Sequence, residues 1–313
     1  MSTMTKSLTT SEVSHTYHAK AEVLSGHLRL PLEREIQPQA PVLLNTKRDG
    51  YFFQRAERYS LEGLVAFKSG YTHVSGNRSL KNHGWVTLAT SVLEGLNVLD
   101  VITADRMVAQ LSTEHPVENG HVPYVTFLGT QFENLRIGGY PVQVELDLGI
   151  CGDRPNDPTP YTQDAGFLNR VQRQCESIVG TQNIPRDLQV EYDKELEYLA
   201  ELRTYGDGSG KRESQPNSRA EKGTRNYNER WGEAEDNTPR VKCSLVKEVS
   251  PIPVAKSFGN VLAIPGFGIA SLAAVEVSNR NYFTLTMLDM RLGCIGDGKV
   301  QAVTTSSNGH TYP

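Results

Sequence analysis

The sequence predicts a mainly β fold: an antiparallel β-sandwich of two sheets, interrupted by an inserted α-helical hairpin and a long polar loop. Residues 142–148 alternate apolar and polar side chains, a period of two that gives a strand one face for a core and one for water. Segments rich in β-branched and aromatic residues recur through residues 61–113 and return after residue 241. Helical spacing of apolar residues appears between residues 162 and 205.

The length and charge of the chain limit the class of protein. Its 313 residues suffice for one large β domain with a full core. The 32 basic and 36 acidic residues give a formal net charge of -4, without the basic excess typical of a nucleic-acid binder. We find no apolar secretory signal and no apolar run long enough to span a membrane. The default expectation is a cytoplasmic protein without a nucleic-acid partner, and extracellular assembly stays open.

The β domain is expected to comprise residues 17–161 and 241–313. Residues 1–16 are rich in Ser and Thr and are predicted to form an N-terminal arm. The dipeptide Gly138-Gly139 supplies positive φ without steric cost, so it predicts a hairpin turn between two strands. The apolar side chains of the second strand, which should face the core, are Val142, Val144, Leu146 and Leu148.

Residues 162–205 are predicted to form two amphipathic helices. In the first, Thr162 is placed as the N-cap and Gly180 as the C-terminal stop; in the second, Pro185 begins the helix, which ends before Gly206. Each helix has a single apolar stripe. These stripes consist of Leu168, Val171, Cys175 and Ile178, and of Leu188, Tyr192, Leu196 and Leu199. We expect the helical hairpin to be an insertion outside the β core, docked on a sheet or on another subunit.

The polar segment at residues 206–240 is predicted to order only against another copy of the chain. Residues 204–240 contain no Leu, Ile, Val or Met, so the segment buries too little to offset its ordering entropy. Large amphipathic rings dominate interface energies. We therefore expect Tyr205, Tyr227 and Trp231 to anchor it to a neighbouring subunit. The N-terminal arm could likewise add a strand to an open sheet edge of that neighbour.

One loop has the composition of a calcium site. Asp153, Asn156 and Asp157 offer two carboxylates and an amide within five residues, the hard oxygen ligands that calcium prefers. The same Asx residues are also ordinary turn formers. Calcium is the one cofactor that the sequence suggests.

Catalytic interpretations have little support in the sequence. Carboxylates that interrupt apolar strands could pair in a cleft for glycoside hydrolysis, although charges on the wet face of a sheet explain them equally. These carboxylates are Glu94, Asp100, Asp105 and Glu114. A thiol hydrolase would need one of the four cysteines beside a histidine, and no local signature marks such a pair. The cysteines, which lie far apart and could form two long-range disulfides, are Cys151, Cys175, Cys243 and Cys294.

The C-terminal segments VLAIPGFGIASL, FTLTMLDMRLGC and NGHTYP resemble the end of a group of uncharacterised bacterial β-rich proteins. The resemblance covers about the last 55 residues. It implies a bacterial source and a β-sandwich, and it carries over no activity and no site residue.

Taken together, these patterns favour a non-enzymatic, self-associating structural subunit, a homo-oligomer or filament, or an interaction module. The chain lacks a catalytic signature, a cofactor motif and a basic face. The alternatives are a hydrolase with a carboxylate or cysteine site between the sheets, and a carbohydrate- or lipid-binding sandwich. A tight cluster of buried carboxylates in a concave pocket would favour the hydrolase.

Overall fold

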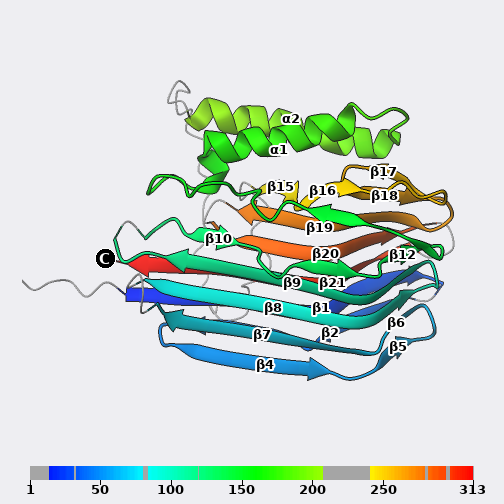
Figure 1. Cartoon of the computed structure of the whole chain (residues 1–313), viewed down its shortest axis with the longest axis horizontal. Coiled ribbons are helices and arrows are strands. Elements are labelled where there is room, and N and C mark those ends of the chain that lie inside the picture. The colour runs from blue at the N-terminus through cyan, green and yellow to red at the C-terminus, as the bar shows by residue number, and fades with distance from the viewer. Residues whose placement is uncertain are drawn as a thin grey trace, which may run out of the picture.

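Two large antiparallel sheets face each other in the computed structural model, which describes residues 14–31, 33–79, 84–118, 120–206, 240–278, 281–293 and 297–312 (Figure 1). The predicted class, a mainly β two-sheet fold, is confirmed. The described residues contain two α-helices, and neither combines the length and apolar character needed to cross a bilayer. Of the polar segment at 206–240, only Gly206 and Arg240 lie within the described residues.

The first sheet has nine strands, with the order β17-β18-β19-β20-β21-β1-β2; β15 also pairs with β19, and β3 with β1. Its strands are β1 (Ser14–Leu30), β2 (Arg34–Gln39), β3 (Val42–Thr46), β15 (Arg240–Ser244), β17 (Lys256–Phe258), β18 (Val261–Ile264), β19 (Gly268–Ser278), β20 (Phe283–Leu292) and β21 (Asp297–Tyr312). The first and last strands of the chain are therefore neighbours.

The second sheet has ten strands, with the order β13-β12-β9-β8-β6-β5; β10 and β11 also pair with β9, and β7 lies between β8 and β4. Its strands are β4 (Gly50–Ala56), β5 (Tyr59–Leu61), β6 (Val65–Phe67), β7 (Ser69–Arg78), β8 (Trp85–Val98), β9 (Ile102–His115), β10 (Tyr124–Thr126), β11 (Gln131–Glu133), β12 (Arg136–Ile137) and β13 (Tyr140–Pro141). A separate two-stranded sheet joins β14 (Val144–Leu146) to β16 (Val246–Val249).

Alternating burial explains why the long strands form a sandwich. In β1, His15, Tyr17 and Ala19 are buried, and the residues between them are partly exposed. This strand pairs with β21 from Ser14, opposite Tyr312, to Leu30, opposite Asp297. Residues 14–16, predicted to belong to the arm, are therefore part of a long interior strand of the first sheet, between β21 on one side and β2 and β3 on the other.

The main hydrophobic core fills the space between the two sheets, and a smaller cluster of buried residues lies near β4. The large cluster draws on β8, β9, β19, β20 and β21, among others. The smaller cluster lies where β1 and β3 of the first sheet meet β7 and β8 of the second. Its buried members are Tyr17, Ala19, Ala21, Val42, Leu44, Val74, Trp85 and Ala89.

The helical hairpin forms, with corrected ends. A 3-10 helix, η1 (Tyr161–Gln163), contains Thr162, so the N-cap of α1 (Ala165–Val179) is Asp164, whose carboxylate accepts the N–H of Phe167 at 2.7 Å. Gly180 is the C-cap, as predicted. The second helix, α2 (Arg186–Gly206), begins directly after Pro185.

The helices are part of the main core, which corrects the expectation that they lie outside it. Phe167, Leu168 and Val171 are fully buried in the same cluster as the strands. The amide of Gln174 on α1 bonds both the N–H and the C=O of Ser244, at 3.1 and 2.8 Å. This side chain satisfies main-chain groups of β15 much as a neighbouring strand would, so the helices cover one end of the sandwich (Figure 1).

The predicted hairpin at Gly138-Gly139 forms, but its strands are short. Both glycines have positive φ, 56° and 83°, between β12 and β13. The strand that follows is only β14, and it pairs with β16 outside both large sheets. Val142 is buried, whereas Val144, Leu146 and Leu148 are half-buried against the main core. The four apolar side chains therefore face the core as predicted, but three of them stay partly exposed.

Candidate interaction surface

Aromatic side chains lie exposed on the last strand of the second sheet. Within the described residues β4 pairs with β7 alone, so its other edge carries main-chain groups that no strand satisfies. Tyr51 is 65% exposed, and Phe52 and Phe53 are each 50% exposed. Leu43 on the neighbouring strand β3 is 56% exposed. We call Leu43, Tyr51, Phe52 and Phe53 the aromatic edge.

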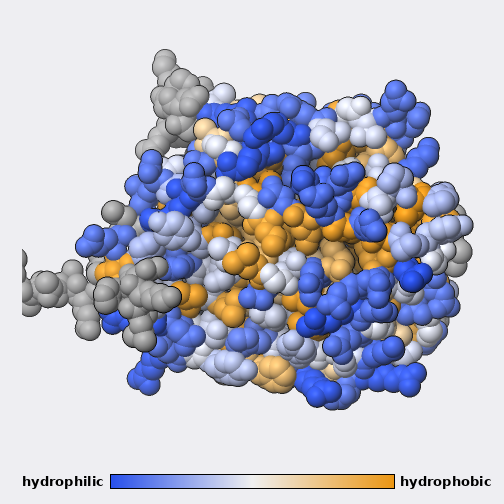
Figure 2. Space-filling view, viewed as in Figure 1, coloured by the Kyte–Doolittle hydropathy of each residue, from blue (hydrophilic) through white to orange (hydrophobic). Residues whose placement is uncertain are grey.

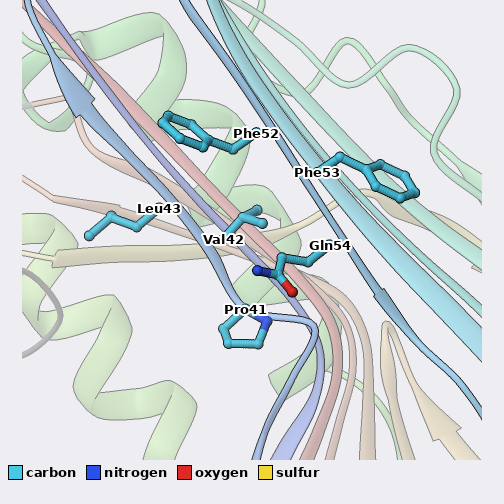
Figure 3. A pocket seen from close by; sticks show the side chains of 6 residues that line it. All are labelled: Pro41, Val42, Leu43, Phe52, Phe53 and Gln54. Carbon is cyan, nitrogen blue, oxygen red and sulfur yellow. The ribbon is translucent and has the colours of Figure 1, made fainter.

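A groove runs along the aromatic edge between β3 and β4, which belong to different sheets (Figure 3). Its volume is about 220 Å³, and its lining consists of Pro41, Val42, Leu43, Phe52, Phe53 and Gln54. Phe52 and Phe53 point to opposite sides of β4, as consecutive strand residues must (Figure 3). The groove contains no charged side chain. Its lining combines five apolar residues with the amide of Gln54.

On the outer face of the second sheet, rings of β4 lie beside rings of β7. The Tyr51 and His73 rings are 4.5 Å apart, and the Phe53 and Tyr71 rings stack at 5.8 Å. Partial burial lowers the pKa of the His73 imidazole, because desolvation disfavours its charged form. These contacts hold two rings of the aromatic edge in place.

The base of β4 is held by the small core cluster. Gly50 lies against Leu44, and Gly76, opposite it on β7, lies so close to the Tyr17 ring that a Cβ there would be 2.5 Å from it. Burial and the Asp49 carboxylate raise the pKa of the Tyr17 phenol, which donates a hydrogen bond to that carboxylate. The strand that carries the aromatic edge is thus fixed at one end.

Charged side chains flank the aromatic edge. Arg55 and Glu57 pair at 2.9 Å, with side chains 62% and 75% exposed. Lys47, Arg48 and Asp49 form the exposed turn at the other end of β4. An exposed pair such as Arg55–Glu57 contributes little to stability.

A second apolar area lies on the face seen in Figure 2, where hydrophobic residues gather between the helices at the top and the lower strands. Tyr124 and Leu128 are among the exposed apolar residues of the chain, at 50% and 65%. The guanidinium of Arg154 lies over the Tyr124 ring, 5.2 Å from its centroid. Because β10 pairs with β9, Tyr124 does not combine an exposed ring with an open strand edge as β4 does.

The predicted calcium loop is held by protein contacts. Asp157 accepts the N–H of Val122 at 2.9 Å and lies 3.8 Å from Arg154 Nη2. Asp153 and Asn156 are exposed, and the Asn156 carbonyl accepts the N–H of Thr159 in a turn. No three His, Cys, Asp or Glu side chains within the described ranges are grouped closely enough to hold a metal ion. Calcium binding here remains a prediction.

Of the predicted interface anchors, Tyr205 lies in the last turn of α2. Tyr227 and Trp231 lie outside the described residues, so their role stays a prediction. The aromatic edge did not appear among the sequence-based candidates. The signal available was the run Tyr51-Phe52-Phe53, three consecutive rings of which an alternating strand can bury only one face.

The carboxylates considered for catalysis interact separately with polar neighbours. Glu94 accepts the Ser69 hydroxyl at 2.7 Å. Asp100 accepts the amide of Asn97 at 2.6 Å, and Asp105 that of Asn134 at 2.7 Å. Cross-strand and turn partners therefore account for these three.

The cysteines that the structure describes are free thiols: Cys151, Cys175 and Cys243. Burial raises the pKa of Cys151 and of Cys175 to about 12, and that of Cys243 well above its ordinary value. A thiolate is the nucleophilic form, so these three thiols are poor nucleophiles in the folded protein.

The comparisons identify a family without a known activity. A family model described as "Domain of unknown function (DUF8256)" matches residues 15–278. The chain belongs to this family, and the match ends before most of the C-terminal pattern discussed above. No curated protein and no solved structure matches.

Proposed function

We propose that this member of the DUF8256 family is a self-associating structural subunit, and that the aromatic edge is its contact surface. The observation that carries the proposal is the coincidence of an open strand edge with exposed rings at Tyr51, Phe52 and Phe53. Edge strands are normally protected by charge, proline or a covering element, because unpaired main-chain groups invite strand addition. Exposed apolar patches mark interaction sites.

The open edge of β4 and its exposed aromatic rings would both stabilise a contact with a partner strand. Strand addition satisfies main-chain donors and acceptors, and side-chain burial beside it supplies the hydrophobic free energy that hydrogen bonds in water do not. Aromatic rings provide large contact areas with few rotatable bonds. Leu43 of the other sheet extends the same apolar surface, so a partner strand would contact both halves of the sandwich.

Sedimentation velocity over a wide range of protein concentrations tests the proposal, with negative-stain imaging to detect filaments. We expect the weight-average sedimentation coefficient to rise with concentration. Phe52→Ser should reduce the associated fraction several-fold. Tyr124→Ser is the matched control, because Tyr124 has the same 50% exposure on a paired strand. A wild-type protein that stays monomeric throughout would refute the proposal.

A further inference from the structure

We infer that the partner at the aromatic edge is a second copy of this chain, paired antiparallel through its own β4 in the register that places Phe52 opposite Phe52. This inference rests on the proposed self-association and specifies its contact. Three features support it: the open edge of β4, the symmetry of an antiparallel strand pair and the order of charges in residues 47–57.

Symmetry restricts the registers available to two identical strands. A two-fold axis that relates neighbouring antiparallel strands must be perpendicular to the sheet, so both copies keep the same face outward. Opposed residues share a face of the sheet, whereas consecutive residues of one strand point to opposite faces. The axis must then pass through a residue that opposes itself, and pairing centred between two residues is excluded. Only registers centred on single residues remain.

Charges at the two ends of β4 favour one register among those centred on residues 51 to 54. Centring on Phe52 brings Arg55 toward Asp49 and Glu57 toward Lys47, so opposite charges come together just beyond the ends of β4, which spans Gly50–Ala56, while Arg48 faces Ala56. Centring one residue earlier opposes Arg55 to Lys47, and one residue later opposes Glu57 to Asp49, both like-charge pairs. Centring two residues later leaves Arg55 and Glu57 opposite aromatic rings. Opposed like charges destabilise a strand pair, whereas opposite charges stabilise it.

The same register pairs the rings. Phe53 comes opposite Tyr51 twice, on the outer face where both rings already lie beside rings of β7. Phe52 meets its symmetry mate on the other face, next to the groove that Leu43 lines. Cross-strand aromatic pairs are among the more stabilising pairs in antiparallel sheets. The contact is self-complementary and closes as a dimer, so a filament would need a second contact.

Charge reversal tests the register. Glu57→Lys should oppose two lysines across the interface at both ends, raising the dimer dissociation constant about tenfold or more. Adding Lys47→Glu to that variant restores opposite charges, and we expect the affinity to return toward the wild-type value. Both side chains are exposed, and because Glu57 also pairs with Arg55 of its own chain, circular dichroism checks the monomer fold of each variant. Sedimentation equilibrium at low salt measures the constants.

Cysteine cross-linking provides a second test, in a Cys294→Ser background. Phe52→Cys places two thiols directly opposite across the axis, where Cβ atoms of an antiparallel pair lie about 5 Å apart. Gln54→Cys is the control: its thiols would be four residues out of register, about 14 Å apart. Mild oxidation should link the first variant into a covalent dimer and leave the second unlinked.

The outcomes separate the two proposals. A wild-type chain that never associates overturns both. Association with an unchanged dissociation constant in Glu57→Lys, or with cross-linking at position 54 rather than 52, overturns the register and leaves self-association standing. Restored affinity on adding Lys47→Glu, together with cross-linking at position 52 and none at position 54, supports the register centred on Phe52.

Discussion

Tyr17 donates a hydrogen bond from its hydroxyl to Asp49 Oδ1 at 2.8 Å, and this bond ties the turn between β3 and β4 to the long strand β1. Tyr17 is almost fully buried, at 1% exposure, beneath Gly76 of β7. The bond therefore links the core to the strand that carries the aromatic edge.

Removing this bond should loosen β4 without emptying the core. We expect Tyr17→Phe to lower the free energy of unfolding by about 1 kcal/mol, because the ring stays and one hydrogen bond to a charged group is lost. Urea unfolding followed by circular dichroism measures the change. Tyr140→Phe, at an exposed ring on β13, is the control and should be neutral. An unchanged Tyr17→Phe midpoint would show that the bond does not contribute.

Alkaline pH should destabilise the protein through its buried phenols. Burial raises the pKa of Tyr17, Tyr161 and Tyr192 above the ordinary value of 10.0. A raised pKa means that the unfolded chain releases the proton first. The stabilisation is therefore complete below pH 10 and is lost as the pH rises above it. The free energy of unfolding should fall between pH 9 and 11, and that of a Tyr161→Phe variant should fall less steeply than that of the wild type.

Burial of α1 leads to a third prediction. Phe167 is fully buried between the helix and the sheets, in edge-to-face contact with Tyr161 at 5.7 Å. We expect Phe167→Ala to lower the free energy of unfolding by about 3–5 kcal/mol, since it leaves a cavity in the main core. Val190→Ala on the exposed side of α2 is the control, with an expected loss below 0.5 kcal/mol. A small loss at Phe167 would restore the view of the helices as an independent insertion.

The sequence predicted the class of fold because β-branched and aromatic residues are dense in the long strands, as in β8 and β9. It missed β2 and β3, which lie in a stretch containing Pro31, Pro38 and Pro41. Pro38 is tolerated in β2 because that strand ends the first sheet and needs fewer ladder hydrogen bonds. The position of β2 at the edge of its sheet allows this proline, and a local sequence pattern does not show where in a sheet a strand will lie.

The candidate surface escaped prediction for a related reason. A run of three aromatic residues predicts a strand, but whether its rings are buried depends on which strand lies beside it. Only the topology shows that β4 ends its sheet. The same applies to the helical hairpin: its apolar stripes were evident, whereas the covering of β15 by Gln174 depends on the three-dimensional arrangement.

The buried thiols allow a last prediction about reactivity. Cys151, Cys175 and Cys243 are free, and burial raises the pKa of each. In a Cys294→Ser variant the folded protein should react with a thiol reagent at pH 8 far more slowly than after unfolding in guanidinium, because the reagent needs an exposed thiolate. Titration before and after denaturation should reveal three thiols only in the unfolded chain. Fast labelling of Cys175 in the folded protein would mean that α1 opens readily, which would contradict its place in the main core. Failure to recover three thiols after unfolding would instead show that a disulfide forms in solution.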